Sequence, residues 1–359
     1  MTYQGQRSKV KGQKSKVHGV ADRPERSGGK KGQRSKVKSQ SQKSKVKSQR
    51  STRSDRPKER KVKAVKVRNI ILTILLVVLG SVTARGQLVW QISGNGALDK
   101  SYLFATNKLT DISFLDSIPN LFKVYTKCDK VITEFVMLDY EAIAALRTAS
   151  LLPDSVRLMN FYTEDEYKEI DGALMATLGM GLQQLGRMKP QYLTEMYRTE
   201  LFKQWAGYRE DRSSEHFFEG VAQQQGKPVH GLDEIGEAMY MMFDREPFHW
   251  QCTELKKVIE YPEREVKQEK ILRDLYKQGR LLDISYQVKG PDNQTTISFS
   301  DHKVYCDRNR TWVRRLEPYL REGKAFICLN AIYLGGEDGL IAQLQAAGYR
   351  VKPVNKAKR

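Results

Sequence analysis

The sequence has 359 residues and a formal net charge of +20, a balance that suggests a nucleic-acid or membrane-surface partner. The excess is confined to residues 1–68, which hold 24 Lys/Arg and 4 Asp/Glu, whereas residues 69–359 hold 38 of each. A compact domain that binds nucleic acid would carry the charge in its folded part. The neutral body argues against that class, and its length suits one large domain or two small ones.

Residues 1–68 are rich in Lys, Arg, Ser, Gln and Gly and hold few large apolar side chains. A basic-Ser-Lys-Val-basic pattern recurs at Arg7–Lys11, Lys14–His18, Arg34–Lys38 and Lys43–Lys47. Such a segment cannot bury enough apolar surface to offset its ordering entropy, so we expect disorder. Two interpretations stay open: a polycation that binds nucleic acid or anionic lipid, and a solvated tail or residues upstream of the true start.

An apolar stretch from Ile70 to Val82 follows a group of Lys and Arg residues. A helix of this length spans about 20 Å, less than the roughly 30 Å hydrocarbon core of a bilayer. The stretch resembles the apolar part of a signal peptide, and Ala84-Arg85-Gly86 fits a small-x-small cleavage site before Gln87. We therefore predict that residues 69–86 are a signal peptide or an uncleaved N-terminal anchor. The protein is then periplasmic or secreted, with a membrane contact only if cleavage fails.

The body, residues 87–359, opens and closes with strand patterns around a helix-rich middle. Aromatic and aliphatic runs between turn formers predict strands at Leu88–Ser93, Ser101–Ala105, Lys130–Phe135, within Gly226–Gly231, at Ala325–Asn330 and at Tyr349–Val354. Helices are predicted at Pro119–Cys128, through most of 140–225 with a capped start at Thr163 and another after Pro190, and at Pro262–Gln278, Asp307–Arg321 and Asp338–Ala347. This order predicts an α/β (α+β) fold, a mixed central sheet covered by helices.

The four cysteines are Cys128, Cys252, Cys306 and Cys328, and their spacings match no zinc-site pattern. An exported protein permits disulfides, and Cys252 with Cys306 is the first pair to examine. Cys328 lies within the apolar run Ala325–Leu329, which predicts a buried free thiol.

Several short segments of the body occur in a characteristic order. They are Val89–Ser93 followed by Ser101–Phe104, Val131–Glu134, Met188–Pro190, Gly226–Asp233, Arg308-Asn309 with Trp312, Gly336–Leu340 and Ala347–Val351. On these motifs the chain resembles the TraB/GumN family of metal-dependent hydrolase-like proteins, which includes the TIKI-type metallopeptidases. The resemblance covers residues 88–354, with Asp233 where the family usually has Glu. It implies a single TraB/GumN-like domain over residues 87–359.

The chain departs from this family at two positions. The resemblance implies two Gly-x-x-His motifs that supply metal ligands, and these fall at Ala105–Lys108 and Asn330–Tyr333. Lys108 and Tyr333 therefore replace the two histidines. A protonated lysine has no acceptor for a metal, and a tyrosine with a pKa near 10 is rarely a phenolate. We expect no metal or other cofactor at these positions.

Three retained residues are the candidate catalytic groups. Glu134, at a strand end, could be a general base or metal ligand, or a carboxylate paired at the sheet edge. Arg308 and Asn309 could orient a carbonyl or oxyanion, or form a hydrogen-bond and salt-bridge network at a helix start. Because Lys108 occupies a lost ligand position, we also expect its ammonium to pair with Glu134, which would otherwise be a buried unpaired charge.

These features favour an exported, catalytically degenerate relative of metal-dependent hydrolases. Its cleft would bind a peptide, a glycan or a protein partner, and no nucleic acid is expected for the body. The first alternative is an active, peptidase-like hydrolase with rearranged ligands for Mn, Co or Zn. The second alternative is a tail-driven binder of nucleic acid or anionic lipid.

Overall fold

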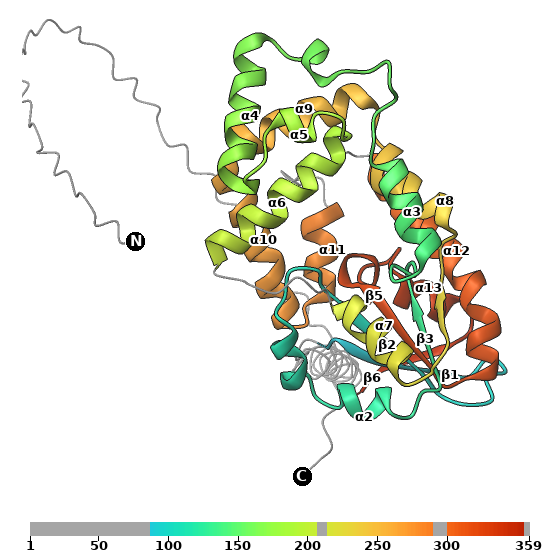
Figure 1. The fold of residues 1–359 in the computed structure, drawn as a ribbon. Coiled ribbons are helices and arrows are strands. Elements are labelled where there is room, and N and C mark those ends of the chain that lie inside the picture. Colours follow the sequence, from blue (N-terminus) through green and yellow to red (C-terminus); the bar gives the residue numbers. More distant parts are fainter. Residues whose placement is uncertain (1–86, 207–213, 290–299, 355–359) are drawn as a thin grey trace, which may run out of the picture. The chain divides into compact units, whose positions relative to one another are not determined.

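The computed structural model describes residues 87–206, 214–289 and 300–354 (Figure 1). All of them belong to one compact unit, Leu75–Arg359. The predicted disordered tail and the predicted signal segment lie outside the described residues. Within the described part of the chain, no helix combines the length and apolarity needed to cross a membrane.

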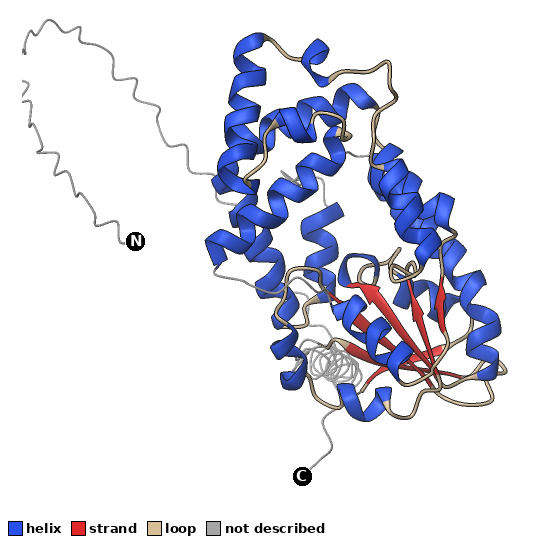
Figure 2. Ribbon diagram, in the orientation of Figure 1, coloured by secondary structure: helices blue, strands red, loops and turns tan. Residues whose placement is uncertain are grey.

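A mixed six-stranded sheet forms one side of the fold (Figure 2). Its strands are β1 (Val89–Ser93), β2 (Ser101–Thr106), β3 (Lys130–Thr133), β4 (Val229–Gly231), β5 (Ala325–Asn330) and β6 (Arg350–Pro353). They are arranged in the order β4-β3-β5-β2-β1-β6. The first four in this order pair in parallel, whereas β1 is antiparallel to both β2 and β6.

Helices supply most of the remaining described structure. The α-helices are α2 (Leu121–Tyr125), α3 (Tyr140–Ala149), α4 (Glu164–Leu178), α5 (Leu182–Leu185), α6 (Pro190–Ala206), α7 (Ser214–Gln224), α8 (Ile235–Met239), α9 (Phe248–Glu260), α10 (Pro262–Lys277), α11 (Leu281–Lys289), α12 (Ser300–Glu322) and α13 (Leu340–Ala346). Short 3-10 turns occur at η1 (Ile112–Ser117), η2 (Leu158–Phe161) and η4 (Ala331–Tyr333), and a π-helical turn at η3 (Tyr240–Asp244).

The main core lies on the sheet, where aromatic rings fill the space under α7. Phe104 on β2 stacks on its neighbour Phe326 on β5, and both rings contact Phe218 of α7. Tyr125 of α2 packs edge-on against Phe326 and also contacts Phe218. Phe218 is fully buried, so it joins two strands and two helices into one apolar cluster.

A second core holds the helix-rich middle together. Buried side chains such as Leu174 of α4, Leu193 of α6 and Leu255 of α9 form a cluster separate from the sheet core. Helix α4 starts as predicted, with the Thr163 side chain and Glu166 forming a reciprocal capping box. The chain therefore folds into a sheet layer and a helical layer, seen in the lower and upper parts of Figure 1.

The parallel strands bring their carboxyl ends to one edge of the sheet. In the register, Thr106 at the end of β2 lies opposite Asn330 at the end of β5, and Thr133 at the end of β3 lies opposite Cys328. Segments that follow these strands are thereby collected in one place. Ligands of open α/β sheets bind outside this edge.

The predicted fold class is confirmed, and several boundaries differ from the prediction. Strand β3 ends at Thr133 rather than Phe135, because the Thr133 hydroxyl donates to the Phe135 carbonyl and turns the chain out of the ladder. Helix α12 begins at Ser300, ahead of the predicted Asp307. Helix α2 covers only the middle of the predicted Pro119–Cys128.

Cys252 on α9 and Cys306 on α12, the first pair to examine, form no disulfide. All four cysteines are buried and none is in a disulfide. Cys252 and Cys306 are each 5% exposed. Cys328 is a buried thiol outside any disulfide, as predicted.

Replacing Phe218 by Ala should lower the free energy of unfolding by about 3–5 kcal/mol, since it removes the ring shared by two strands and two helices. Urea denaturation measures the change. Leu98→Ala is the control, because Leu98 is 84% exposed, and its effect should stay within about 0.5 kcal/mol. Equal losses in the two variants would contradict the assignment of the main core.

Candidate functional site

A cavity of about 1270 Å³ lies between the sheet edge and the helical layer. Its lining includes Lys108 after β2, Glu134 after β3, Tyr333 at the end of η4 and Arg308 from α12. The parallel strand ends thus bring together four of the five positions singled out in the sequence. Asn309 is the exception and does not line this cavity.

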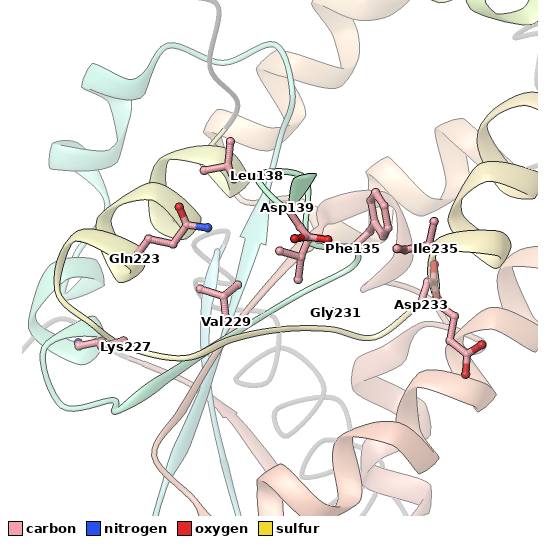
Figure 3. A pocket seen from close by; sticks show the side chains of 11 residues that line it. Phe135, Leu138, Asp139, Gln223, Lys227, Val229, Gly231, Asp233 and Ile235 are labelled. Atoms are coloured by element: carbon pink, nitrogen blue, oxygen red, sulfur yellow. The ribbon is translucent and has the colours of Figure 1, made fainter. Parts of the chain in front are cut away.

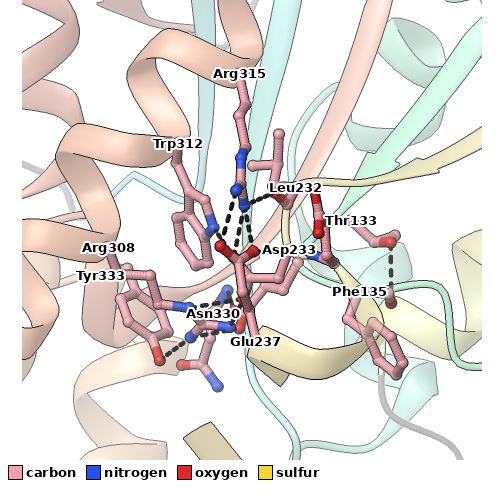
Figure 4. Close-up of polar contacts among 12 residues, drawn as sticks. Thr133, Phe135, Leu232, Asp233, Glu237, Arg308, Trp312, Arg315, Asn330 and Tyr333 are labelled. Atoms are coloured by element: carbon pink, nitrogen blue, oxygen red, sulfur yellow. Dashed lines mark hydrogen bonds and ion pairs between the residues drawn. The ribbon is translucent and has the colours of Figure 1, made fainter. Parts of the chain in front are cut away.

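The Arg308 guanidinium is the centre of the site (Figure 4). Its Nε donates to Asp233 Oδ2 at 2.9 Å, and its Nη2 also binds that oxygen. Its Nη1 lies 3.2 Å from Glu134 Oε2 and donates to the Tyr333 hydroxyl. One buried cation therefore contacts two carboxylates and a phenol. Burial lowers the pKa of Arg308, and the two carboxylates oppose this effect and raise it.

Asp233 holds Arg308 from the loop that follows β4. Its side chain is only 4% exposed, and its second oxygen, Oδ1, accepts a hydrogen bond from Trp312 Nε1 at 2.6 Å. Arg315 lies about one turn after Trp312 on α12 and donates to the Leu232 carbonyl at 2.7 Å. Its Nη1 and Nη2 also donate to the two carboxylate oxygens of Glu237. Asp233 is thereby fixed from two sides, so it in turn fixes Arg308.

Glu134 is held in a similar way from the neighbouring strand. Its Oε1 accepts the backbone N–H of Asn330 at 2.8 Å, and its Oε2 faces Arg308. Burial raises the pKa of Glu134, the nearby Asp233 charge adds to this, and Arg308 and the Asn330 amide oppose it. The sheet-edge pairing considered for Glu134 is present, with Arg308 as its partner.

Tyr333 packs its ring between two aromatic neighbours. The ring centroid lies 4.8 Å from that of Trp312 and 5.0 Å from that of Tyr305. Arg308 stacks over the Tyr333 ring, 4.7 Å from its centroid. Burial raises the pKa of the Tyr333 hydroxyl well above 10, so the side chain remains a neutral phenol at physiological pH.

Asn309 has a structural position. It is fully buried in the middle of α12. The predicted position at a helix start is therefore wrong, because α12 begins at Ser300. Its Nδ2 donates to the backbone carbonyls of Tyr333 and Asp338, at 3.0 and 3.1 Å. Asn309 therefore anchors η4 and the loop before α13 onto α12. These two contacts are structural, and the catalytic role of Asn309 stays a prediction.

The predicted ion pair between Lys108 and Glu134 is wrong. The Lys108 ammonium lies 3.8 Å from Glu195 of α6, and its side chain is about half exposed. Among the described residues, the cation that pairs with Glu134 is Arg308. Lys108 therefore pairs with the helical layer, whereas Arg308 is the cation that contacts both carboxylates at the sheet edge.

The helical wall of the cavity carries a charge cluster that sequence reasoning missed. Arg198 of α6 donates to Glu265 of α10 at 2.8 Å. The same guanidinium contacts Glu195 at 3.2 Å and also binds Glu254 of α9. The three-residue spacing of Glu195 and Arg198 on one helix was the only local signal. The contacts with α9 and α10 depend on how the helices pack.

Glu269 lies in the same wall of the cavity. It lines the cavity, yet it makes no hydrogen bond or ion pair with the described residues. Burial raises its pKa to about 7, with Glu195 adding to the effect and Lys108, Arg273 and Arg198 opposing it. A carboxylate with a pKa near neutrality in a cleft is a feature of functional sites.

The donor atoms of the site do not fit a divalent metal. Glu134 and Asp233 already accept hydrogen bonds from Arg308, Trp312 and the Asn330 amide. Tyr333 stays a phenol, and Lys108 offers no lone pair while protonated. Within the described ranges, no group of three or more His, Cys, Asp or Glu is arranged to hold a metal ion.

A second, smaller groove of about 600 Å³ lies beside the edge strand β4 (Figure 3). It runs between Val229 on β4, Leu138 after β3 and Ile235 at the start of α8. Asp233 reaches both the groove and the Arg308 network. The groove contains none of the other residues of that network.

A comparison with models of protein families identifies the family of this chain. The model of the TraB/PrgY/gumN family matches residues 88–353. The chain belongs to this family. The suspected relationship is thereby confirmed over nearly the whole body, the part that folds into the sheet, the helical layer and the cavity. Neither the search of curated proteins nor the search of solved structures found a match.

Replacing Asp233 by Asn should lower the free energy of unfolding by about 3 kcal/mol, the low end of the range for a broken buried ion pair, since Glu134 stays as a counter-charge. Urea denaturation at neutral pH measures it. Glu237→Gln is the matched control, because it removes an exposed partner of Arg315 and should cost less than about 1 kcal/mol. If Asp233→Asn and wild type had the same urea midpoint of unfolding, the proposed role of Asp233 would be refuted.

Replacing Glu269 by Gln should stabilise the protein above neutral pH. A carboxyl whose folded pKa is raised to about 7 binds more protons in the folded than in the unfolded state between about pH 4.5 and 7, so wild-type stability falls over that window. The variant lacks this loss and should gain about 1–3 kcal/mol at pH 8 and almost nothing at pH 4.5.

Urea denaturation of both proteins across this pH range tests the Glu269 prediction. Glu263→Gln, an exposed position on the same helix, should show no such trend. A pH-independent difference between Glu269→Gln and wild type would show that Glu269 titrates normally.

Proposed function

We propose that this family member binds a peptide in its cavity without hydrolysing it. The observation that carries the proposal is the ion-pair network at the sheet edge, in which Arg308 contacts both Glu134 and Asp233 from inside the protein. A hydrolytic centre needs a group free to activate water. Glu134 is instead paired with a guanidinium and a backbone amide, which oppose its taking up a proton from water, although its oxygens keep lone pairs that can accept a hydrogen bond.

The lining of the cavity favours a peptide over the other two ligand classes considered. Apolar side chains such as Met137, Met242 and Phe243 alternate in it with charged groups of both signs. Its volume of about 1270 Å³ exceeds the roughly 300–1,000 Å³ of drug-sized pockets. An extended peptide with mixed side chains matches this combination. Export through the predicted segment 69–86 forms part of the proposal.

Affinity selection from a random oligopeptide pool tests the proposal on the purified full-length chain. Wild type should retain peptides in EDTA, and mass spectrometry should find no new peptide ends, with or without added Mn, Co or Zn. Metal-dependent cleavage would instead establish the alternative of an active hydrolase. Failure to retain any peptide would refute peptide binding.

A cavity-filling variant tests whether the peptide binds in this cavity. Thr199 of α6 lines it, so Thr199→Trp should lower the affinity for selected peptides by about tenfold or more, equal to about 1.4 kcal/mol. Glu169→Trp is the matched control, because Glu169 is exposed on α4 and does not line the cavity. Equal affinities of the two variants would place the binding site elsewhere.

A further inference from the structure

Tyr333 carries a buried hydrogen-bond donor that no described residue uses. The residue is 6% exposed and lines the cavity. Its hydroxyl oxygen accepts from Arg308 Nη1, so its own proton must point away from that nitrogen. Among the described residues no acceptor is recorded for this proton, and a buried unused donor is costly.

The rings and the guanidinium around Tyr333 fix the direction of the hydroxyl. Trp312 and Tyr305 pack against its ring, and Arg308 contacts both the ring and the oxygen. Because burial keeps the phenol protonated, the donor is present throughout the physiological pH range. A prepositioned donor of this kind loses little entropy when it binds an acceptor.

Glu134 supplies an acceptor at nearly the same place. Its Oε2 and the Tyr333 oxygen both contact Arg308 Nη1, so the two oxygens lie close together at the cavity floor. Each carboxylate oxygen has a second lone-pair direction, and one donor contacts each oxygen among the residues that the structure describes. The floor therefore presents one donor and one acceptor side by side.

We propose that Tyr333 and Glu134 together bind the backbone of one extended residue of the peptide. The Tyr333 hydroxyl donates to the carbonyl of that residue, and Glu134 accepts its N–H. In an extended chain the N–H and C=O of a single residue point the same way, as they do in an antiparallel ladder. This assignment rests on the proposed peptide-binding function and names the chemistry by which the floor recognises its ligand.

Charge also favours a backbone amide over a free carboxylate. Glu134 lies next to the donor and would repel an anionic ligand, while Arg308 is already shared between two carboxylates. A neutral peptide group has the required donor and acceptor and no charge to desolvate. A residue within a peptide, rather than its C-terminus, is therefore expected at the floor.

The experiment uses the full-length chain and peptides selected from the random pool, with acetylated and amidated ends. Tyr333→Phe keeps the ring and removes the donor, so it should weaken binding about 3–10-fold, the value of one neutral hydrogen bond. Tyr192→Phe is the control: Tyr192 lines the same cavity but lies on α6, and its loss should stay within about twofold.

N-methylation along a selected peptide tests the second contact. Methylating one internal residue should weaken binding to wild type by about tenfold or more, because a hydrogen bond to a charged acceptor is lost. The same methyl group should matter much less for Glu134→Gln. Thermal unfolding of each variant shows whether it is folded. If Glu134→Gln does not fold, the comparison of Tyr333→Phe with wild type still tests the proposal.

The outcomes separate the two proposals. Peptides retained equally by wild type and Tyr333→Phe, with no sensitive N-methyl position, would overturn the backbone contact and leave peptide binding intact. No retention by wild type would overturn both. Binding of a chitin oligosaccharide that requires the Tyr333 hydroxyl, without peptide binding, would reassign the floor to a glycan amide and overturn the peptide assignment.

Discussion

The buried guanidinium of Arg308 is the interaction on which the site depends. Removing such a cation from water costs several kcal/mol unless its partners surround it, and here Asp233, Glu134 and Tyr333 do so. These partners come from the loop after β4, the end of β3 and η4, while Arg308 comes from α12. Four segments distant in sequence are therefore held together by one charge.

The two walls of the cavity differ in how their charges are satisfied. At the sheet edge the network is closed, with Arg308 shared by two carboxylates. On the helical wall Arg198 contacts three carboxylates. Glu269 makes no ion pair with the described residues, and burial raises its pKa to about 7. Lys108 belongs to the helical wall. A ligand thus meets a floor of ion-paired side chains and a wall whose charge depends on pH.

Much of the sheet and of its edge could be predicted from the sequence. Period-two and buried apolar runs mark strands, and the family resemblance assigned Lys108 and Tyr333 to metal-ligand positions, with Glu134 a candidate ligand. The parallel strand ends explain why these residues line one cavity. The partners of Lys108 and Arg198 could not be predicted, since they depend on how helices rotate and pack. The cysteines could not be settled for a similar reason: Cys252 lies on α9 and Cys306 on α12, and their spacing does not show how these helices pack.

Metal content measured after equilibrium dialysis tests the central claim most directly. The full-length chain is dialysed against Mn, Co or Zn, and the bound metal is counted per chain. If Arg308 takes the place of a metal as the cation between Glu134 and Asp233, wild type should hold far less than one equivalent. One equivalent bound by wild type and lost in Glu134→Ala would contradict the account.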